Sequence, residues 1–151
     1  MANGGVRHGE DIVQANAHKT VLVTDDDPLL REIAAKVIHS HGYHVLTAES
    51  GEQALALFAA GTPIDLHVLD VVMTPIDGIE TMTQLRERGF GDVPVVLLTA
   101  QSSDEDLLDG YRAGAGYYLT KPFKPVELLN IVDYLIGDLS SEQREQLTLR
   151  L

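Results

Sequence analysis

The sequence predicts an α/β fold, in which a doubly wound parallel sheet of five strands is covered by five helices. Five short runs are rich in β-branched and aliphatic residues and have the length of buried strands. Between them, apolar residues recur at three- and four-residue spacing, which is typical of helices. This alternation favours parallel strands with helices on both faces of the sheet. The predicted strands are Thr20–Thr24, His44–Ala48, Leu66–Asp70, Val93–Thr99 and Tyr117–Thr120.

Start signals precede most of the predicted helices. Asp27 before Pro28 and Ser50 are N-cap candidates, Ser102 or Ser103 has the same role further on, and Pro125 suits a first turn. Each helix then presents one apolar face to the sheet. These faces comprise Leu30, Ile33, Ala34, Val37 and Ile38; Ala54, Leu55, Leu57 and Phe58; Ile79, Met82 and Leu85; Leu107, Leu108 and Tyr111; and Val126, Leu129, Val132 and Ile136.

The chain divides into three segments. Residues 1–18 are rich in Gly, Asn and His without an apolar period, so we expect a flexible tail. Residues 19–137 contain all the predicted strands and helices and form one folded domain. Residues 138–151 form a C-terminal extension, either a short helix or a linker stub, in which Ser140 and Gln143 have capping-box spacing.

Composition excludes several classes of protein. The chain has 151 residues, 44% of them hydrophobic, which suits one domain with a sizeable core. Its net charge of −12 argues against direct nucleic-acid binding through phosphate contacts. It has no cysteine, and its apolar runs are too short for a membrane span or a signal peptide. We therefore expect a soluble, intracellular protein.

Polar residues capable of chemistry follow four of the predicted strands. Asp25, Asp26 and Asp27 come after the first strand, Asp70 ends the third, Thr99 ends the fourth, and Lys121 follows the fifth. Ligands of open α/β sheets bind beyond the carboxyl ends of the strands. The three consecutive acids form either a cation site or a solvated turn in which Asp27 caps a helix. Carboxylates with a lysine and a hydroxyl suit phosphoryl transfer with a hard divalent cation.

In this combination and order, the chain resembles the bacterial response-regulator receiver domain, the phosphoacceptor partner of sensor histidine kinases in two-component phosphorelays. The resemblance spans residues 19–137 and implies the flavodoxin-like receiver fold with strand order 2-1-3-4-5. It implies that Asp70 is phosphorylated to an aspartyl phosphate. It also implies Mg²⁺, for which Mn²⁺ can substitute. Asp26 would be a direct ligand, Asp25 would support the metal partly through water, and Asp70 and the backbone carbonyl of Val72 would complete the metal site.

The resemblance gives the remaining residues their expected roles. Thr99 would contact the phosphoryl group, and Lys121 would pair with it beside a cis peptide bond to Pro122. Tyr118 would swing inward as Thr99 moves toward the phosphate. Asp27 is left to cap the helix that starts at Pro28.

The implied partners are a sensor histidine kinase or phosphotransfer protein and a downstream protein effector. The effector would bind the face formed by the helix around Leu107–Tyr111, the strand Tyr117–Thr120 and the helix from Pro125. No nucleic acid or membrane is expected to bind directly, and the chain would be a monomer or a phosphorylation-dependent dimer in the cytoplasm. It would catalyse its own phosphoryl transfer and slow autodephosphorylation, without turnover of another substrate.

Three other functions compete with this interpretation. A haloacid-dehalogenase-like phosphatase would use Asp25 as nucleophile, but it needs an acidic pair after Lys121, where only the isolated Asp133 and Asp138 follow. A nucleotide-binding domain would need a glycine-rich loop where the acids stand. A receiver that cannot be phosphorylated could act as a binding module, because Thr74–Pro75 departs from the Met-Pro pattern common in the family.

Histidines at 39, 41 and 44 have the spacing of metal ligands but surround a predicted helix end, where dipole complementarity explains them better. His67 falls within a predicted strand and is expected to be a packed or edge residue. The glycines around Gly114 lack the pattern of a phosphate-binding loop and are expected to end a helix.

Overall fold

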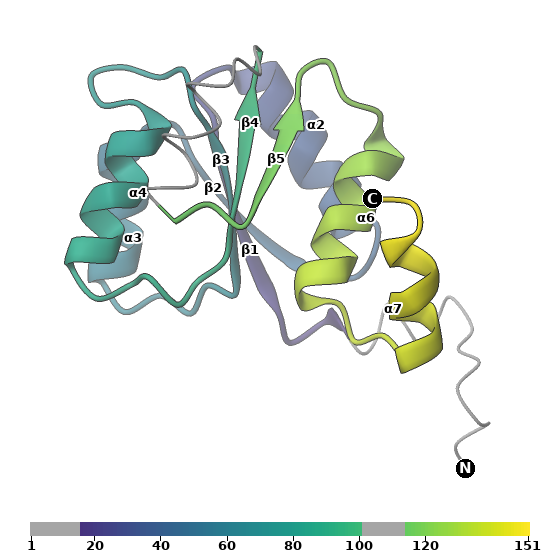
Figure 1. Ribbon diagram of the computed structural model, residues 1–151. Coiled ribbons are helices and arrows are strands. Elements are labelled where there is room, and N and C mark those ends of the chain that lie inside the picture. Colours follow the sequence, from purple (N-terminus) through teal and green to yellow (C-terminus); the bar gives the residue numbers. More distant parts are fainter. Residues whose placement is uncertain (1–15, 101–113) are drawn as a thin grey trace.

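The computed structural model describes residues 16–100 and 114–151 and shows one sheet of five parallel strands (Figure 1). The strand order is β2-β1-β3-β4-β5, which confirms the predicted order 2-1-3-4-5. The strands are β1 Thr20–Thr24, β2 His44–Ala48, β3 Leu66–Asp70, β4 Val95–Thr99 and β5 Tyr117–Thr120.

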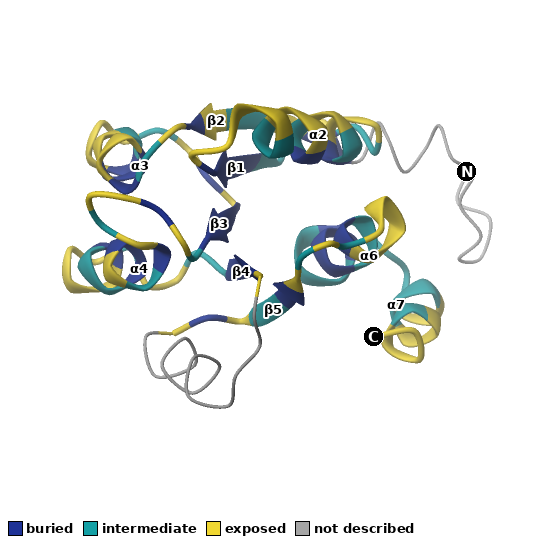
Figure 2. Ribbon diagram, turned by 90° about the horizontal axis from the view of Figure 1, so that it is seen from above, coloured by how far each residue is buried: buried dark blue, intermediate teal, exposed yellow. Residues whose placement is uncertain are grey.

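Helices lie on both faces of the sheet (Figure 2). Helices α2 (Pro28–His39) and α6 (Pro125–Ile136) cover one face, whereas α3 (Gly51–Ala59) and α4 (Gly78–Glu87) cover the other. A further helix, α7 (Ser141–Thr148), packs against α6 rather than against the sheet. The helix predicted around Leu107–Tyr111 lies outside the described residues.

The two faces of the sheet carry separate hydrophobic cores. Alternate residues of each strand point to opposite sides, so Val21 and Val23 pack toward α2 and α6, whereas Leu22 packs toward α3. Every residue of β3 and β4 is buried, as expected for central parallel strands. Each fully buried Val, Leu or Ile contributes about 1.5–3 kcal/mol, so this double core is the main source of stability.

The predicted helix starts are confirmed where the structure describes them. The Asp27 carboxylate accepts hydrogen bonds from the amides of Leu29 (2.9 Å) and Leu30 (3.3 Å). Ser50 caps α3 by accepting from the Gln53 amide at 3.1 Å, and Pro125 is at the start of α6. These side chains satisfy amides that have no partner within the helix.

The C-terminal extension contains a helix that its capping box initiates. The Ser140 hydroxyl accepts from the Gln143 amide at 3.1 Å, and the Gln143 side chain accepts from the Ser140 amide at 2.9 Å. The fourth strand begins at Val95 instead of the predicted Val93. Pro94 has no N–H to give to the ladder, although its carbonyl still accepts from the His67 amide. No helix within the described ranges is long and apolar enough to cross a membrane.

One glycine allows α4 to approach the end of β3. A Cβ atom on Gly78 would lie 2.2 Å from the Asp70 carbonyl oxygen and 3.0 Å from the Val71 Cα. We predict that Gly78→Ala lowers the free energy of unfolding by about 1–3 kcal/mol, because the helix start or the strand end must shift. Urea denaturation measures this loss. Gly116→Ala is the control, since its Cβ would lie 3.7 Å from the Val95 carbonyl, and equal losses in both variants would contradict the prediction.

Candidate functional site

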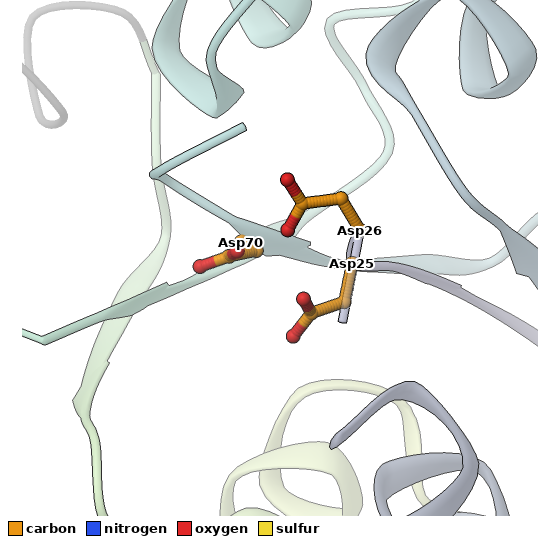
Figure 3. Close-up of side chains that lie close together, drawn as sticks. All are labelled: Asp25, Asp26 and Asp70. Atoms are coloured by element: carbon orange, nitrogen blue, oxygen red, sulfur yellow. The ribbon is translucent and has the colours of Figure 1, made fainter. Parts of the chain in front are cut away.

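Three carboxylates gather at the carboxyl end of the sheet, where β1 and β3 end side by side (Figure 3). Asp25 and Asp26 directly follow β1, and Asp70 is the last residue of β3. Each contributes a carboxylate oxygen to a group whose oxygens all lie within 4.8 Å of one another. We call Asp25, Asp26 and Asp70 the acidic cluster.

The members of the acidic cluster differ in their exposure. Asp25 is 1% exposed and Asp70 is 5% exposed, whereas Asp26 faces solvent. The Asp25 carboxylate accepts a hydrogen bond from the Asp27 amide at 2.9 Å, and Arg31 donates to the Asp25 backbone carbonyl at 2.8 Å. These bonds hold the turn after β1 in place. The acidic cluster thus consists of two buried carboxylates, Asp25 and Asp70, and one accessible carboxylate, Asp26.

Lys121 brings a positive charge to the cluster from the end of β5. Its Nζ lies 3.1 Å from Asp25 Oδ2 and 3.1 Å from Asp70 Oδ1. The Lys121 amide donates to the Thr99 carbonyl at 2.7 Å, so the hydrogen bonding between β4 and β5 extends to Lys121. The peptide bond to Pro122 is cis, as predicted, and the Thr74–Pro75 bond, which was not predicted to be cis, is cis as well.

One ammonium therefore serves two buried carboxylates. Burial, followed by the charge of Asp25, raises the pKa of Asp70 to about 6, although the hydrogen bond and the charge of Lys121 act in the opposite direction. For Lys121, burial lowers the pKa, but its bond to Asp70 and the two negative charges outweigh burial and raise it. Lys121 consequently remains an ammonium at neutral pH, and Asp70 is largely ionised there.

The other expected site residues occupy neighbouring positions. Thr99 is the buried last residue of β4, the strand that pairs with β3. Tyr118 is half-buried on β5, where it pairs in register with Leu97 and so lies further from the strand end than Thr99 does. Val72 is in the loop after Asp70, with its side chain 69% exposed. The structure thus gathers four residues closely and places Thr99 at the adjoining strand end.

The acidic cluster can perform two kinds of chemistry. Carboxylate oxygens are the ligands that hard divalent cations such as Mg²⁺ prefer. An ionised carboxylate beside an ammonium can also attack a phosphoryl group while the ammonium stabilises the charge on its oxygens. Among the described residues, no other group of three acidic or histidine side chains converges in this way.

His67 and His39 have structural partners away from the acidic cluster. His67 is fully buried on β3, and its Nε2 lies 2.8 Å from the Thr24 hydroxyl. Of the two predicted alternatives, a packed or an edge residue, it is therefore the packed one. Burial lowers its pKa to about 3, which keeps the ring neutral. His39 lies near the Tyr43 carbonyl at 3.3 Å, and the three histidines at 39, 41 and 44 do not converge on a common point.

The sequence did not reveal a second polar cluster, which joins the turn after α2 to α6. Asp133 accepts a hydrogen bond from the Tyr43 hydroxyl at 2.6 Å, and its other oxygen lies 2.8 Å from His41 Nδ1. Both Tyr43 and Asp133 are buried. The partners are about ninety positions apart, so no local spacing could have indicated the contact.

Comparisons with known proteins agree on one family. Residues 21–133 match the family described as the response regulator receiver domain. The transcriptional regulatory protein YvrH of Bacillus subtilis is 41% identical over 110 residues, which are 72% of this chain and 45% of that protein. The response regulator MprA of Mycobacterium sp. (strain KMS) is 44% identical over 123 residues, 82% of this chain and 53% of that protein.

Solved structures show the same architecture. The chemotaxis protein CheY4 of Vibrio cholerae superimposes with a TM-score of 0.74 at 31% identity, covering 78% of this chain and 98% of that one. The receiver domain of the Francisella response regulator 1452 gives a TM-score of 0.73 at 33% identity, with 78% and 96% covered. The chain spans about half the length of the curated relatives it matches, and nearly all of these single-domain structures.

Proposed function

Because the chain belongs to the response-regulator receiver family, we propose that it accepts a phosphoryl group on Asp70 and transmits a conformational change to a protein partner. One observation carries this proposal: Lys121 Nζ lies 3.1 Å from both buried carboxylates, Asp25 and Asp70, with Asp26 beside them. A nucleophile, a cation-binding set and a counter-charge for phosphoryl oxygens are thus in one place.

The proposed reaction begins with the ionised Asp70 carboxylate. Because the pKa of Asp70 is about 6, most Asp70 side chains are ionised at pH 7.5, and the ionised carboxylate has a lone pair available for attack. A carboxylate oxygen forms a bond to phosphorus while the P–N bond of a phosphohistidine donor breaks, and that bonding pair stays on the imidazole nitrogen. The Lys121 ammonium moves its hydrogen bond from the carboxylate to a phosphoryl oxygen, and the Thr99 hydroxyl donates to another.

The carboxylates of Asp25, Asp26 and Asp70, with the Val72 carbonyl, would hold Mg²⁺ or Mn²⁺. The fit rests on the chemistry of the donors: all are oxygens, and three of them converge without any nitrogen or sulfur ligand. Bound there, the cation would neutralise charge that develops on the transferring phosphoryl group. In its absence, the Lys121 ammonium compensates part of the negative charge of Asp25 and Asp70.

We predict that Mg²⁺ raises the melting temperature, because it binds the folded chain and relieves repulsion within the acidic cluster. Stabilisation amounts to about 2.7 kcal/mol when the free cation is at roughly one hundred times its Kd. Differential scanning fluorimetry with and without millimolar MgCl₂ measures the shift. Asp26→Asn should reduce it, while Glu52→Gln on α3 should not, and an equal shift in all three proteins would indicate binding elsewhere.

Membership of the receiver family also suggests which proteins this chain binds. A sensor histidine kinase or phosphotransfer protein would donate the phosphoryl group in the cytoplasm. An effector would read the face that contains β5 and α6, on which Tyr118 changes position as Thr99 moves toward the phosphoryl group. Phosphorylation would shift a pre-existing equilibrium between two conformations.

The phosphatase alternative finds no support at the site. It requires acidic residues after Lys121, but Asp133 is bound to Tyr43 and His41 in the second polar cluster. It also leaves Asp70 without a role, although Lys121 contacts Asp70 as closely as it contacts Asp25.

Intact-mass measurement after incubation with acetyl phosphate and Mg²⁺ tests the proposal directly. We expect wild type to gain one phosphoryl group, Asp70→Asn to gain none, and omission of Mg²⁺ to reduce the gain strongly. Asp25→Asn is the discriminating variant, since loss of the label from this variant alone would favour the phosphatase. If wild type stays unlabelled, the chain is a receiver fold that acts only by binding.

A further inference from the structure

A groove of about 480 Å³ runs along β5 and α6, and the C-terminal residues form part of its wall. Tyr118 and Lys121 line it from β5, Asn130 lines it from α6, and Arg150 and Leu151 line it from the segment after α7. Figure 1 shows the C-terminal end of the chain next to α6. The groove thus connects the end of the chain with Tyr118 and with Lys121 of the candidate site.

We propose that residues 138–151 act as a strap that covers part of the β5–α6 face and that an effector must displace. One wall of the groove is therefore a segment of the same chain, which lies where an effector would have to approach β5 and α6. This inference rests on the proposed function in one respect, since it assumes that the β5–α6 face is the one that a partner reads.

One arginine joins α7 to the end of α6 through polar contacts. Arg144 on α7 donates through Nη1 to the Tyr134 carbonyl and through Nη2 to the Gly137 carbonyl at 3.2 Å. Its guanidinium carbon also lies 5.7 Å from the centre of the Tyr134 ring, within the range of a cation–π contact. These carbonyls are at the end of α6, where cationic side chains are favourable.

The rest of α7 holds the strap only weakly. None of its residues is buried, and beyond it Leu149 is 79% exposed and Leu151 is 43% exposed. A helix of eight residues that buries no side chain gains little from hydrophobic packing. The capping box at Ser140 gives the segment a defined shape without fixing it to the domain.

The segment that joins the strap to α6 is held more firmly than its free end. The buried Asn16 accepts a hydrogen bond from the Asp138 amide at 3.3 Å, and its amide group donates to the His41 carbonyl at 2.9 Å. Lys19 donates to the Ile136 carbonyl. Residues 136–138 are therefore held by the rest of the domain, so loss of the Arg144 contacts should release the part of the strap that lines the groove at residues 150 and 151.

The absence of cysteine from the chain allows a direct test. A single cysteine is introduced by Asn130→Cys on the groove wall, and its rate of labelling by a polyethylene-glycol maleimide reports access to the groove. We expect Arg144→Ala to raise this rate severalfold, and Ser140→Ala, which removes the cap of α7, to raise it as well. Circular dichroism confirms that each variant remains folded.

Two matched controls separate release of the strap from general effects. Arg88→Ala removes an equal charge directly after α4, where the Arg88 side chain donates to the Gln84 side chain at 3.2 Å, and it should leave the rate unchanged. A cysteine placed by Glu52→Cys, on the exposed side of α3, should react equally in all backgrounds. Equal Asn130→Cys rates with Arg144 present and absent would overturn the strap.

The same samples are tested for phosphorylation by acetyl phosphate, which separates the two proposals. Faster labelling in Arg144→Ala without any phosphorylation would support the strap and contradict the proposed function. Normal phosphorylation on Asp70 with an unchanged rate of maleimide labelling in Arg144→Ala would support the proposed function and contradict the strap.

Discussion

Replacement of Asp70 by Asn is expected to raise the free energy of unfolding by about 3 kcal/mol at pH 7.5 in metal-free buffer. The pKa of Asp70 rises from 3.8 to about 6 because the carboxylate is buried and lies beside Asp25. Each pKa unit corresponds to about 1.4 kcal/mol, so ionised Asp70 costs the folded state roughly 3 kcal/mol relative to the unfolded chain. An amide of similar shape removes this cost.

The gain should depend on pH in a defined direction. A carboxyl group whose pKa is raised on folding binds its proton more tightly in the folded state, so wild-type stability falls as pH increases from about 4 to 6. The two proteins should therefore be similar near pH 4 and diverge until slightly above pH 6. Urea denaturation in EDTA across this range measures the difference. Asp26→Asn, on the exposed member of the cluster, is the control, and parallel curves for wild type and Asp70→Asn would refute the prediction.

This expected gain has a functional meaning. The proposed phosphoacceptor, Asp70, would then destabilise the metal-free fold. The repulsion between Asp70 and Asp25 that causes this cost would also favour binding of a cation. Addition of Mg²⁺ should narrow the difference between wild type and Asp70→Asn, because the cation stabilises the protein that retains the full acidic cluster.

Asp133→Ala is expected to lower the free energy of unfolding by about 2–4 kcal/mol. The substitution leaves the fully buried Tyr43 hydroxyl without its acceptor and removes the partner of His41. Loss of one member of a buried polar network leaves the others desolvated and unpaired, which costs more than the bond itself contributed. Thermal and urea denaturation measure the loss, and Tyr43→Phe is the milder comparison because it removes the hydroxyl with its bond.

The loss should be greater in acid than in base. The hydrogen bond to Asp133 raises the pKa of His41, burial opposes the rise, and the charge of Asp133 adds to it. A histidine with a raised pKa contributes stability below its ordinary pKa of 6.5, and this contribution disappears as pH rises through the folded-state value. NMR titration of His41 in wild type and Asp133→Ala should show the pKa fall in the variant. If the pKa of His41 is the same in both proteins, the His41–Asp133 ion pair does not account for the pH dependence of the stability loss.

Much of the fold and the acidic cluster could be predicted from the sequence. Short runs of β-branched and aliphatic residues located the strands, and apolar spacing of three and four residues located most described helices. Asp27, Ser50 and Ser140 indicated helix starts. Parallel strands bring their carboxyl ends to one edge of the sheet, so Asp25, Asp70 and the residue after β5 were expected at that edge. Asp25 lies next to Asp70 because the strand order, which the resemblance to the receiver family implied, places β1 and β3 side by side.

Other features could not be read from the chain. The bond of Asp133 to Tyr43 joins residues on different elements, and Asp133 looked like an isolated polar residue of a helix. The position of α7 beside α6 likewise depends on where Arg144 finds carbonyl acceptors, and its own apolar pattern is too weak to indicate a face.

The sequence by itself determined the elements, their order and the residue types at the strand ends, because these depend on periodicity and on side chains adjacent along the chain. Only the tertiary structure decided how those residues are paired and charged. It made Lys121 share its charge between Asp25 and Asp70, buried Asp70 enough to shift its pKa, and set Leu151 against the groove. Such pairings depend on distance and burial across segments far apart in sequence, which local patterns do not carry.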